Sequence, residues 1–463
     1  MTNMNWDKLL CEDRERRSTT SDVPFRNSFD KDYERIISSS SVRRLQDKAQ
    51  VYPLQENDFT RTRLTHSLEV SSIGRSLGKR VGYILKKNGK IDDCTIEKLS
   101  SLLAVAGLVH DLGNPPFGHY GEAVIKEWFN NNQKLFPNTD WFNDYLYFDG
   151  NAQTIRILTR LQFMQDRYGM NFSYGTLATL LKYPWDSSSH YAKLKRKTGF
   201  FISEKELIEH IVSLTGMKIN NYDIRKHPAT YLLEAADDIA YLFADLEDTA
   251  KKKYLPWDTL KDDVVKTSDN INCFKMLREK LNEIAKNNEE KNIPFEERMY
   301  NEVMTLRVMC QGVCIEKVAD EFVNNYDLIM NGNYNEALLD GKATKDLIIF
   351  IRKTCEEYAY KNSEVLTLEL IGKSVLSSLL DKFINSVIDE KNYLNPYHEY
   401  GKLYKLISPN FEYIHHLNDK DKYIDNKKLD LHERVQLVID YISCMTDSYA
   451  LNLHKMLFGM ILP

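Results

Sequence analysis

An apolar helix that ends in a histidine–aspartate pair constrains the fold of this chain more than any other feature. In the segment LLAVAGLVHDLGNPPFGHYGE (residues 102–122), hydrophobic residues recur with helical spacing up to His110, and a glycine and two prolines then stop the helix. His110 and Asp111 are therefore expected in the last turn of a buried helix. Two adjacent side chains that can both bind a cation suggest a metal site at that helix end.

Two further segments carry polar residues on the apolar face of a predicted helix. In LTHSLEVSSIGRSLGKR, apolar residues lie four, seven and eleven positions after His66, so this histidine is expected to point into the core. In HPATYLLEAADDIAYLFADLED, one stripe with steps of four residues contains Leu233, Asp237, Tyr241 and Asp245. An aspartate therefore occupies a core position of the third helix.

Composition favours a mostly helical protein. The 463 residues include only 19 glycines and 12 prolines, fewer than turn-rich β folds use. A chain of this length has room for two domains or for one core with large insertions. The stretch KNNEEKNIPFEE (residues 286–297) resembles a domain linker. We therefore expect an all-α fold, either as two domains or as one core with large insertions.

Charge and cysteine content exclude several classes of protein. The 62 basic and 67 acidic residues give a net charge of -5, which argues against a general nucleic-acid binder but allows a local basic pocket. The seven cysteines are scattered without a Cys-x-x-Cys pair, so neither a disulfide framework nor a cysteine zinc site is expected. The N-terminus is charged and the longest apolar run is LLAVAGLV, so we expect a cytoplasmic protein without a membrane partner.

A bound divalent cation explains the inward polar residues together. Burial of an unpaired carboxylate is costly, whereas imidazoles and carboxylates around a cation satisfy one another's charge and lone pairs. Taken singly, His66 could be a hydrogen-bonded core histidine, His110–Asp111 a helix cap and Asp237 a surface acid. Two histidines and two carboxylates leave coordination positions open, which is typical of a catalytic site. These ligand types are compatible with manganese, magnesium, cobalt, zinc or iron.

The order of His66, His110–Asp111 and Asp237 resembles that of the HD-domain metal-dependent phosphohydrolases. Over about residues 40–250, flanking segments are similar to the deoxynucleoside triphosphate (dNTP) triphosphohydrolases of the dGTPase type. These segments are RRLQDKAQVYPL, TRTRLTHSLEV, HDLGNPPFGHYGE, FDGNAQTIRIL and EAADDIAYLFADLED. A weaker similarity in VIDYISCMTDSYALNLH (residues 438–454) extends toward the C-terminus, although Cys444 stands where the family usually has glycine.

The resemblance implies three regions within an all-α fold. Residues 1–57 would form an N-terminal arm and the start of the active-site shell, and residues 58–262 the HD core. Residues 263–463 would form a helical C-terminal region that completes the pocket and makes oligomer contacts. The family suggests a homo-oligomer, commonly a hexamer, and a possible effector that is either single-stranded DNA or a nucleotide.

The resemblance also implies roles for the predicted site residues. The metal ligands would be His66, His110, Asp111 and Asp237. Asp237 is preferred over its neighbour Asp238, which points about 100° away from the inner stripe. His119 and Glu122, one helical turn apart, resemble the family's catalytic pair. His119 would act on the attacking water or the leaving oxygen, and Glu122 would orient it and support its charge.

Three groups of substrate-binding residues follow from the same resemblance. The phosphate-binding residues would be Arg63, Asn151, Lys182, Tyr183 and Lys197. The sugar pocket would contain Gln50, Tyr241 and Asp245, whose acid and amide can bind the 3′-hydroxyl while the tyrosine ring excludes a 2′-hydroxyl. The base would contact Val51, Tyr360 and Glu369.

The implied reaction is metal-dependent hydrolysis of a dNTP at the α-phosphorus, with dGTP favoured, to deoxynucleoside and tripolyphosphate. The loop DEKNYLNPYHEYGKL lacks an arginine that could read guanine, so hydrolysis of several dNTPs, or activation by one nucleotide for another, stays open. One alternative is an HD phosphohydrolase for a phosphomonoester, a cyclic nucleotide or a guanosine polyphosphate. Another is a nucleotide-sensing or single-stranded nucleic-acid-binding HD protein with Arg14, Arg16 and Arg17 in a basic arm.

Overall fold

The computed structural model describes residues 4–17, 26–54, 59–137, 139–162, 166–219, 223–258, 260–262, 272–342, 344–417, 422–424 and 427–462. This part of the chain is all-α, as predicted, and its only β-pairings are three isolated bridges. None of the described helices is long and apolar enough to span a membrane. The predicted boundary between residues 57 and 58 lies outside the described residues, as does residue 263.

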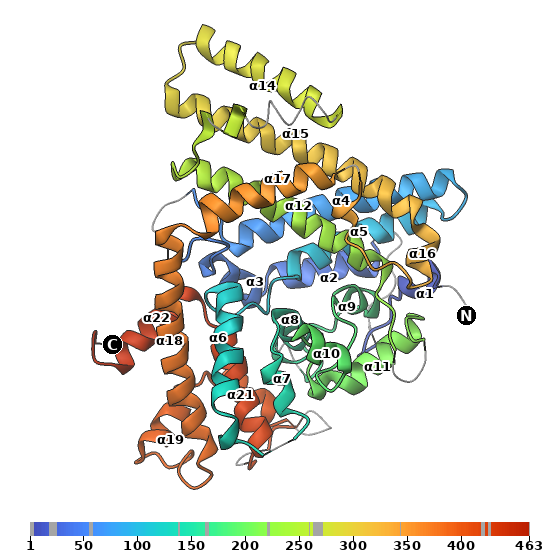
Figure 1. Ribbon diagram of the computed structural model, residues 1–463. Helices are drawn as coiled ribbons and strands as arrows, with labels where there is room; N and C mark the ends of the chain where they lie inside the picture. The colour runs from blue at the N-terminus through green and yellow to red at the C-terminus, as the bar shows by residue number, and fades with distance from the viewer. Residues whose placement is uncertain are drawn as a thin grey trace.

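Three long helices form the centre of the molecule (Figure 1): α4 (Arg63–Lys87), α5 (Asp93–Val109) and α12 (Pro228–Lys251). Glycines let α4 and α5 approach closely, since a Cβ at Gly107 would lie 2.8 Å from the Ser71 backbone. The same helices carry the three polar segments predicted from the sequence. Their close packing therefore brings those segments together.

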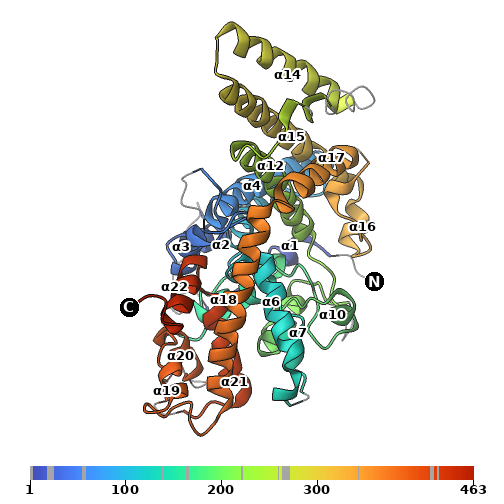
Figure 2. The ribbon, with the colours of Figure 1, turned by 60° about the vertical axis from the view of Figure 1, so that its left-hand side comes forward.

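A second group of helices covers α12 on one side. The pair α14 (Asn272–Glu290) and α15 (Phe295–Asn324) forms a hairpin, and α15 and α17 (Lys345–Cys355) both pack against α12. The hairpin projects from the body in both ribbon views (Figures 1 and 2). Residues 286–297, predicted as a domain linker, contain the turn of this hairpin, so that prediction was wrong.

The C-terminal region packs directly against the helix that follows the His-Asp pair. The long helix α18 (Ser363–Ile388) lies beside α6 (Gly118–Asn131), α19 (Glu399–Tyr404), α21 (Leu431–Ser443) and α22 (Asp447–Leu457). Buried hydrophobic residues from Met4 to Leu453 form one continuous core. The C-terminal residues therefore share a core with the central helices.

Shorter elements complete the described fold. The remaining α-helices are α1 (Trp6–Leu9), α2 (Ser28–Ile37), α3 (Ser40–Arg44), α7 (Phe142–Leu146), α8 (Gly150–Arg156), α9 (Tyr174–Thr179), α10 (His190–Lys195), α11 (Lys205–Leu214), α16 (Tyr326–Met330) and α20 (Pro409–His415). The 3₁₀ turns are Leu45–Asp47, Gln133–Leu135, Ile202–Glu204 and Leu338–Asp340. One π-turn follows α8 at Ile157–Leu161, and another follows α17 at Glu356–Tyr360.

Candidate metal centre and active site

The three central helices bring two histidines and two aspartates to one point. Helix α5 ends at Val109, so His110 is its C-cap residue and Asp111 follows it, one position beyond the predicted last turn. His66 Nε2 lies 3.1 Å from Asp237 Oδ1, and His110 Nε2 lies 3.4 Å from the same oxygen. His110 Nε2 is also 3.4 Å from Asp111 Oδ1. We refer to these four residues as the metal cluster.

The chemistry of the metal cluster fits a divalent cation. His110 Nδ1 lies 2.8 Å from the carbonyl oxygen of Gly107, so Nδ1 carries a hydrogen and Nε2 is the ring nitrogen that would bind an ion. This buried Nε2 atom has no hydrogen-bond partner in the described part of the chain. Ligand atoms of His66, His110 and Asp111 all lie within 4.8 Å of one another. Convergent lone pairs of nitrogen and oxygen are the arrangement that a cation satisfies.

Burial and neighbouring charges act in opposite directions on the pKa values of the metal-cluster residues. Burial lowers the pKa of His110, but the negative charges of Asp111 and Asp237 outweigh it and raise that pKa to about 9. Burial acts in the opposite direction on Asp237, whose pKa is nevertheless held well below its usual range by His110 and His66. The cluster therefore carries carboxylate charge that favours a positive partner.

Arg63 forms one wall of the cluster. Its buried guanidinium Nη1 lies 2.5 Å from Asp111 Oδ2. Gly118 packs against this guanidinium, since a Cβ there would lie 2.4 Å from Arg63 Nη2, and its φ of +61° favours glycine. The start of α6 therefore depends on glycine to bring the backbone against Arg63.

The predicted catalytic pair lies at the start of α6. His119 Nδ1 is 3.6 Å from Glu122 Oε2, and 80% of the His119 side chain is exposed. Glu122 is buried, and its Oε1 accepts a hydrogen bond of 2.9 Å from the backbone N–H of Gly150. The Glu122 carboxylate raises the pKa of His119. An exposed imidazole is thus held by a buried carboxylate, which is the arrangement of a general acid or base and its orienting partner.

Besides Arg63, the predicted phosphate-binding residues lie in two places. A cavity of about 20 Å³ is lined by Asn151 and Lys182 together with His110 and Asp237. Burial lowers the pKa of Lys182, but the charge of Asp237 outweighs it and raises that pKa. This lysine is therefore a cation at the edge of the metal cluster.

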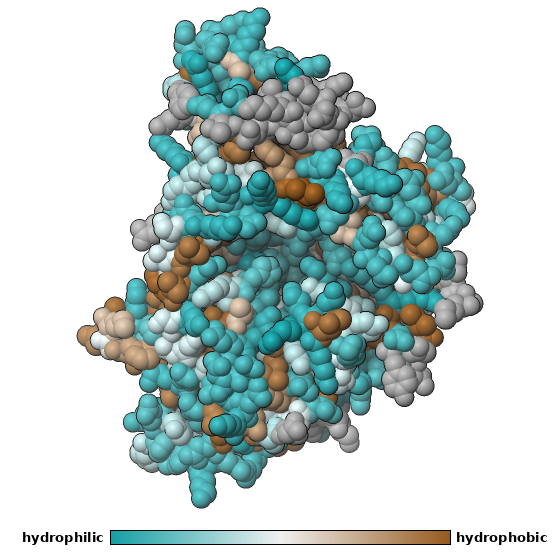
Figure 3. Space-filling view, in the orientation of Figure 1, coloured by the Kyte–Doolittle hydropathy of each residue, from teal (hydrophilic) through white to brown (hydrophobic). Residues whose placement is uncertain are grey.

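Tyr183 and Lys197 lie together at the start of α8. Lys197 Nζ is 3.2 Å from Asp149 Oδ2 and 5.2 Å from the centre of the Tyr183 ring. Asp149 in turn caps α8 by accepting from the Asn151 backbone N–H at 2.9 Å. Hydrophilic side chains also line a recess between α17 and the part that contains α6 and α10 (Figure 3).

The predicted sugar and base residues are only partly brought together. The hydroxyl of Tyr360, predicted for the base, donates to Asp245 Oδ2 at 2.6 Å, so it contacts a residue predicted for the sugar. Burial raises the pKa of Asp245 to about 7. Gln50 Oε1 is buried without a hydrogen-bond partner among the described residues.

The other predicted pocket residues have weaker links to the site. Tyr241 is half-buried, and burial raises its pKa. Val51 and Glu369 are also half-buried, and burial raises the pKa of Glu369. No hydrogen bond or ion pair within the described ranges joins Val51 or Glu369 to the metal cluster. Of the three predicted base residues, Tyr360 is joined to the predicted sugar pocket by its hydrogen bond to Asp245.

Several polar residues that join distant segments were not identified from the sequence. Buried Lys48 donates to the carbonyl oxygens of Asn114 at 2.5 Å and Ser443 at 2.9 Å. Asp447 accepts from the backbone N–H groups of Phe117 and Ala49, both at 2.9 Å. These contacts tie the N-terminal arm and the C-terminal helices to the loop after the His-Asp pair. Isolated charged residues in short segments offered no periodic pattern by which to find them.

The side chains of the two adjacent aspartates point in different directions, as the predicted helical stripe requires. Asp237 points between the two histidines, whereas Asp238 Oδ2 lies 3.6 Å from Arg352 Nη2 on α17. Burial raises the pKa of Asp238 to about 7, and the charge of Asp237 adds to this effect. The pair therefore provides a matched internal comparison of a cluster residue with its neighbour.

Two family models match the chain. The HD domain matches residues 63–138, and the Phosphohydrolase-associated domain matches residues 412–456. The first range includes three of the four metal-cluster residues and the His119–Glu122 pair. The second includes most of α20, all of α21 and most of α22.

Curated relatives match nearly the whole chain. A Listeria monocytogenes protein named Deoxyguanosinetriphosphate triphosphohydrolase-like protein is 36% identical over 99% of this chain and 100% of its own length. A Synechocystis protein of the same name is 33% identical over 99% of this chain and 100% of its own length. The Yersinia enterocolitica Deoxyguanosinetriphosphate triphosphohydrolase is 30% identical over 93% of this chain and 94% of its own length.

Proposed function

Because this chain belongs to the family of HD-domain deoxyguanosinetriphosphate triphosphohydrolases and their homologues, we propose that it is a metal-dependent dNTP triphosphohydrolase that favours dGTP. Membership in this family makes it a hydrolase with an HD domain. The observation that carries the metal dependence is the convergence of His66 and His110 on one oxygen of Asp237. The proposed products are deoxynucleoside and tripolyphosphate.

The four residues of the metal cluster would hold the cation, with manganese, magnesium or cobalt preferred and zinc or iron as alternatives. Such an ion, when bound, lowers the pKa of a coordinated water and neutralises phosphate oxygens. Arg63 would stay paired with Asp111 while facing the triphosphate. Lys182, Tyr183, Lys197 and Asn151 would bind the remaining phosphate oxygens through charge-assisted and neutral hydrogen bonds.

His119 would transfer a proton to the leaving group. Its pKa is raised by Glu122, which favours the protonated imidazole, and this form can donate to the 5′-oxygen as the bond to the α-phosphorus breaks. The buried Glu122 carboxylate, fixed by the Gly150 N–H, orients the imidazole and stabilises its charge. Proton donation gives a neutral deoxynucleoside and leaves the triphosphate chain intact.

Selection of a deoxyribose would depend on Gln50, Tyr241 and Asp245. Asp245 and Gln50 would bind the 3′-hydroxyl, while the Tyr241 ring would leave no room for a 2′-hydroxyl. The hydrogen bond from Tyr360 to Asp245 supports a fixed orientation of this carboxyl group. Val51, Tyr360 and Glu369 are proposed for the base.

The proposed enzyme is a cytoplasmic homo-oligomer, with a hexamer as the expected form and single-stranded DNA or a nucleotide as a possible effector. These proposals derive from the family resemblance. Exposed apolar residues on α18 and at the C-terminal end support association (Figure 3): Leu366, Leu370, Ile371, Met460 and Leu462. Mass photometry with and without dNTP or oligonucleotide measures the subunit number directly.

One assay tests the proposed reaction. The purified protein is incubated with each dNTP singly and in pairs, with magnesium, manganese or cobalt, and the products are separated by chromatography. We expect deoxyguanosine and tripolyphosphate in equal amounts, and no activity in His110→Ala. Pyrophosphate with deoxynucleoside monophosphate would contradict the proposed cleavage site. Turnover of a cyclic nucleotide or a phosphomonoester in place of dNTPs would favour another HD phosphohydrolase.

A further inference from the structure

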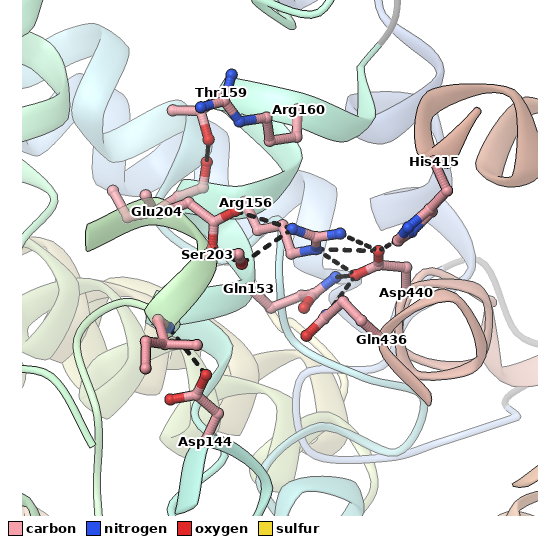
Figure 4. A network of polar contacts seen from close by, with 12 residues as sticks. Asp144, Gln153, Arg156, Thr159, Arg160, Ser203, Glu204, His415, Gln436 and Asp440 are labelled. Atoms are coloured by element: carbon pink, nitrogen blue, oxygen red, sulfur yellow. Dashed lines mark hydrogen bonds and ion pairs between the residues drawn. The ribbon is translucent and has the colours of Figure 1, made fainter. Parts of the chain in front are cut away.

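A buried ion network connects α8 to the C-terminal helix α21 (Figure 4). The Arg156 guanidinium donates to both carboxylate oxygens of Asp440 at 2.8–2.9 Å and, on its other side, to Glu204 Oε1 at 2.8 Å. Gln153 and Gln436 also donate to Asp440 Oδ1, at 3.2 and 2.9 Å. The Asp440 and Glu204 side chains are fully buried. We refer to these five residues as the Arg156 network.

The other end of α8 reaches the candidate active site. The first residue of this helix, Gly150, donates its backbone N–H to Glu122 Oε1 at 2.9 Å. Further along, the Thr154 hydroxyl donates to the His110 carbonyl oxygen at 3.2 Å and accepts from the Gly113 N–H at 2.9 Å. One short helix therefore contacts both the catalytic pair and the backbone of a metal-cluster residue.

We propose that Asp440 and Arg156 are positioning residues for the Glu122–His119 pair, acting through α8. This role rests on the proposed function, because it assigns Glu122 to the reaction. It gives the C-terminal segment matched by the Phosphohydrolase-associated domain a defined part in the reaction: it holds α8 so that the Gly150 N–H fixes the Glu122 carboxylate.

Tight packing at the start of α8 makes this coupling direct. A Cβ at Gly113 would lie 2.2 Å from the Gly150 carbonyl oxygen, and a Cβ at Gly150 would lie 2.1 Å from Asn114 Oδ1. The helix has only seven residues, too few for stability without tertiary contacts. A shift of α8 therefore moves the Gly150 N–H away from Glu122, and a displacement of about 1 Å is enough to reduce catalysis about 100-fold.

A double-mutant cycle separates positioning from general destabilisation. Asp440→Asn should lower kcat about 10- to 100-fold, with KM and bound metal unchanged. In a Glu122→Gln background, the same substitution should change kcat less than about twofold, because the group that it positions is already inactive. Equal losses in both backgrounds would overturn the proposal.

Two further variants serve as an alternative test and as a control. Arg156→Lys keeps the buried charge but loses the bidentate contact with Asp440, so it should show the same loss of kcat. It replaces Asp440→Asn as the test variant if Asp440→Asn does not fold. Arg434→Lys is the matched control on α21. Arg434 is also buried, but it donates to the carbonyl oxygens of Val387 and Leu429 and not to α8. A kcat loss in the control as large as in Asp440→Asn would contradict a specific role.

A second readout does not require dNTP hydrolysis. The His119 pKa is measured by NMR in protein labelled with ¹³C-histidine, and the resonance is identified with His119→Gln. Glu122 raises this pKa, while Arg63 and Asp111 are the other charged groups that act on it. Asp440→Asn should move the His119 pKa down toward its ordinary value, and Arg434→Lys should not. An unchanged His119 pKa in Asp440→Asn would overturn the positioning role, whereas inactivity of the wild type toward all dNTPs would refute only the proposed function.

Discussion

The metal cluster and the Arg156 network are both buried polar sites where helices meet, but their charges are arranged in opposite ways. In the Arg156 network, one guanidinium lies between two carboxylates, and the amide groups of Gln153 and Gln436 also donate to Asp440 Oδ1. In the metal cluster, imidazole nitrogens and carboxylate oxygens face one another, and His110 Nε2 has no hydrogen-bond partner among the described residues. The first site pairs its charged groups within the protein, with Gln153 Oε1 buried without a hydrogen-bond partner among the described residues, whereas the second fits a cation.

This difference indicates what each site contributes. A satisfied ion network orders the segments that it joins, but removal of one partner leaves an uncompensated buried charge. A cluster of convergent acceptors contributes binding energy for an ion, so its worth to stability depends on that ion. Substitutions in the two sites should therefore have different consequences for chemistry and for folding.

The largest expected effect is loss of activity from the metal cluster. Asp237→Asn should abolish metal binding and lower kcat/KM by at least about 10⁴-fold, or more than about 5 kcal/mol, because the cation stabilises charge in the transition state. The matched control is Asp238→Asn, since Asp238 pairs with Arg352. Metal content by mass spectrometry and steady-state kinetics check both variants. Retention of metal in Asp237→Asn, or its equal loss in both, would contradict the ligand assignment.

The next largest effect is on stability and belongs to the Arg156 network. Asp440→Asn should reduce the free energy of unfolding by about 3–5 kcal/mol, because it removes the main partner of a buried guanidinium. The metal content of the folded variant should stay unchanged. Glu127→Gln, which removes an exposed pair with Lys373, should cost less than about 1 kcal/mol. Chemical denaturation measures the free energy of unfolding of the wild type and both variants. A similar loss of stability in both variants would show that the network stabilises the fold no more than an exposed ion pair does.

The two sites also differ in how far the sequence reveals them. His66 and Asp237 could be predicted because each lies on the apolar face of a long periodic helix, where a polar residue conflicts with the pattern. Arg156 and Asp440 could not, because they are 284 positions apart and each has the spacing of an ordinary helix residue. Their importance comes from tertiary packing, which brings α8 against α21.

Prediction of the substrate pocket was limited by the same physical cause. The three long central helices could be predicted from helical periodicity and from the Gly-Pro stop after His110. Val51 lies in a loop, and Tyr360 lies in a π-turn where helical spacing is broken. Without a regular period, neither the direction of a side chain nor its neighbour can be inferred. The hydrogen bond between Tyr360 and Asp245 therefore could not be predicted from the sequence.

Metal addition should stabilise the folded protein through the metal cluster alone. At a free manganese concentration about 100 times the Kd, the free energy of unfolding should rise by about 2.7 kcal/mol, because the ion binds the folded state. Thermal unfolding measured across a manganese titration checks this value. His110→Ala should show no such rise, whereas Asp440→Asn should keep it. Stabilisation of His110→Ala by manganese would indicate binding elsewhere on the chain.

The smallest expected effect is the pH dependence of the Arg156 network. Burial alone would raise the pKa of Asp440, but the charge of Arg156, together with the contact with His415, outweighs burial and lowers that pKa to about 2. Since this carboxylate binds protons more weakly in the folded state, its contribution to stability is complete above about pH 4 and is lost as pH falls through about 2. The full contribution is about 2 kcal/mol, of which roughly half should disappear between pH 5 and 3.

Denaturation of the wild type and Asp440→Asn over this pH range isolates that contribution. Burial lowers the pKa of His227 to about 4, so both proteins should lose stability as pH falls from about 6.5 to 4. Only the wild type should also lose the stability that ionised Asp440 contributes. The difference in free energy of unfolding between the two proteins should therefore become smaller as the pH falls. A gap that stays constant from pH 5 to 3 would mean that Asp440 is not held ionised by Arg156. The ion pairing that distinguishes this network from the metal cluster would then be incorrect.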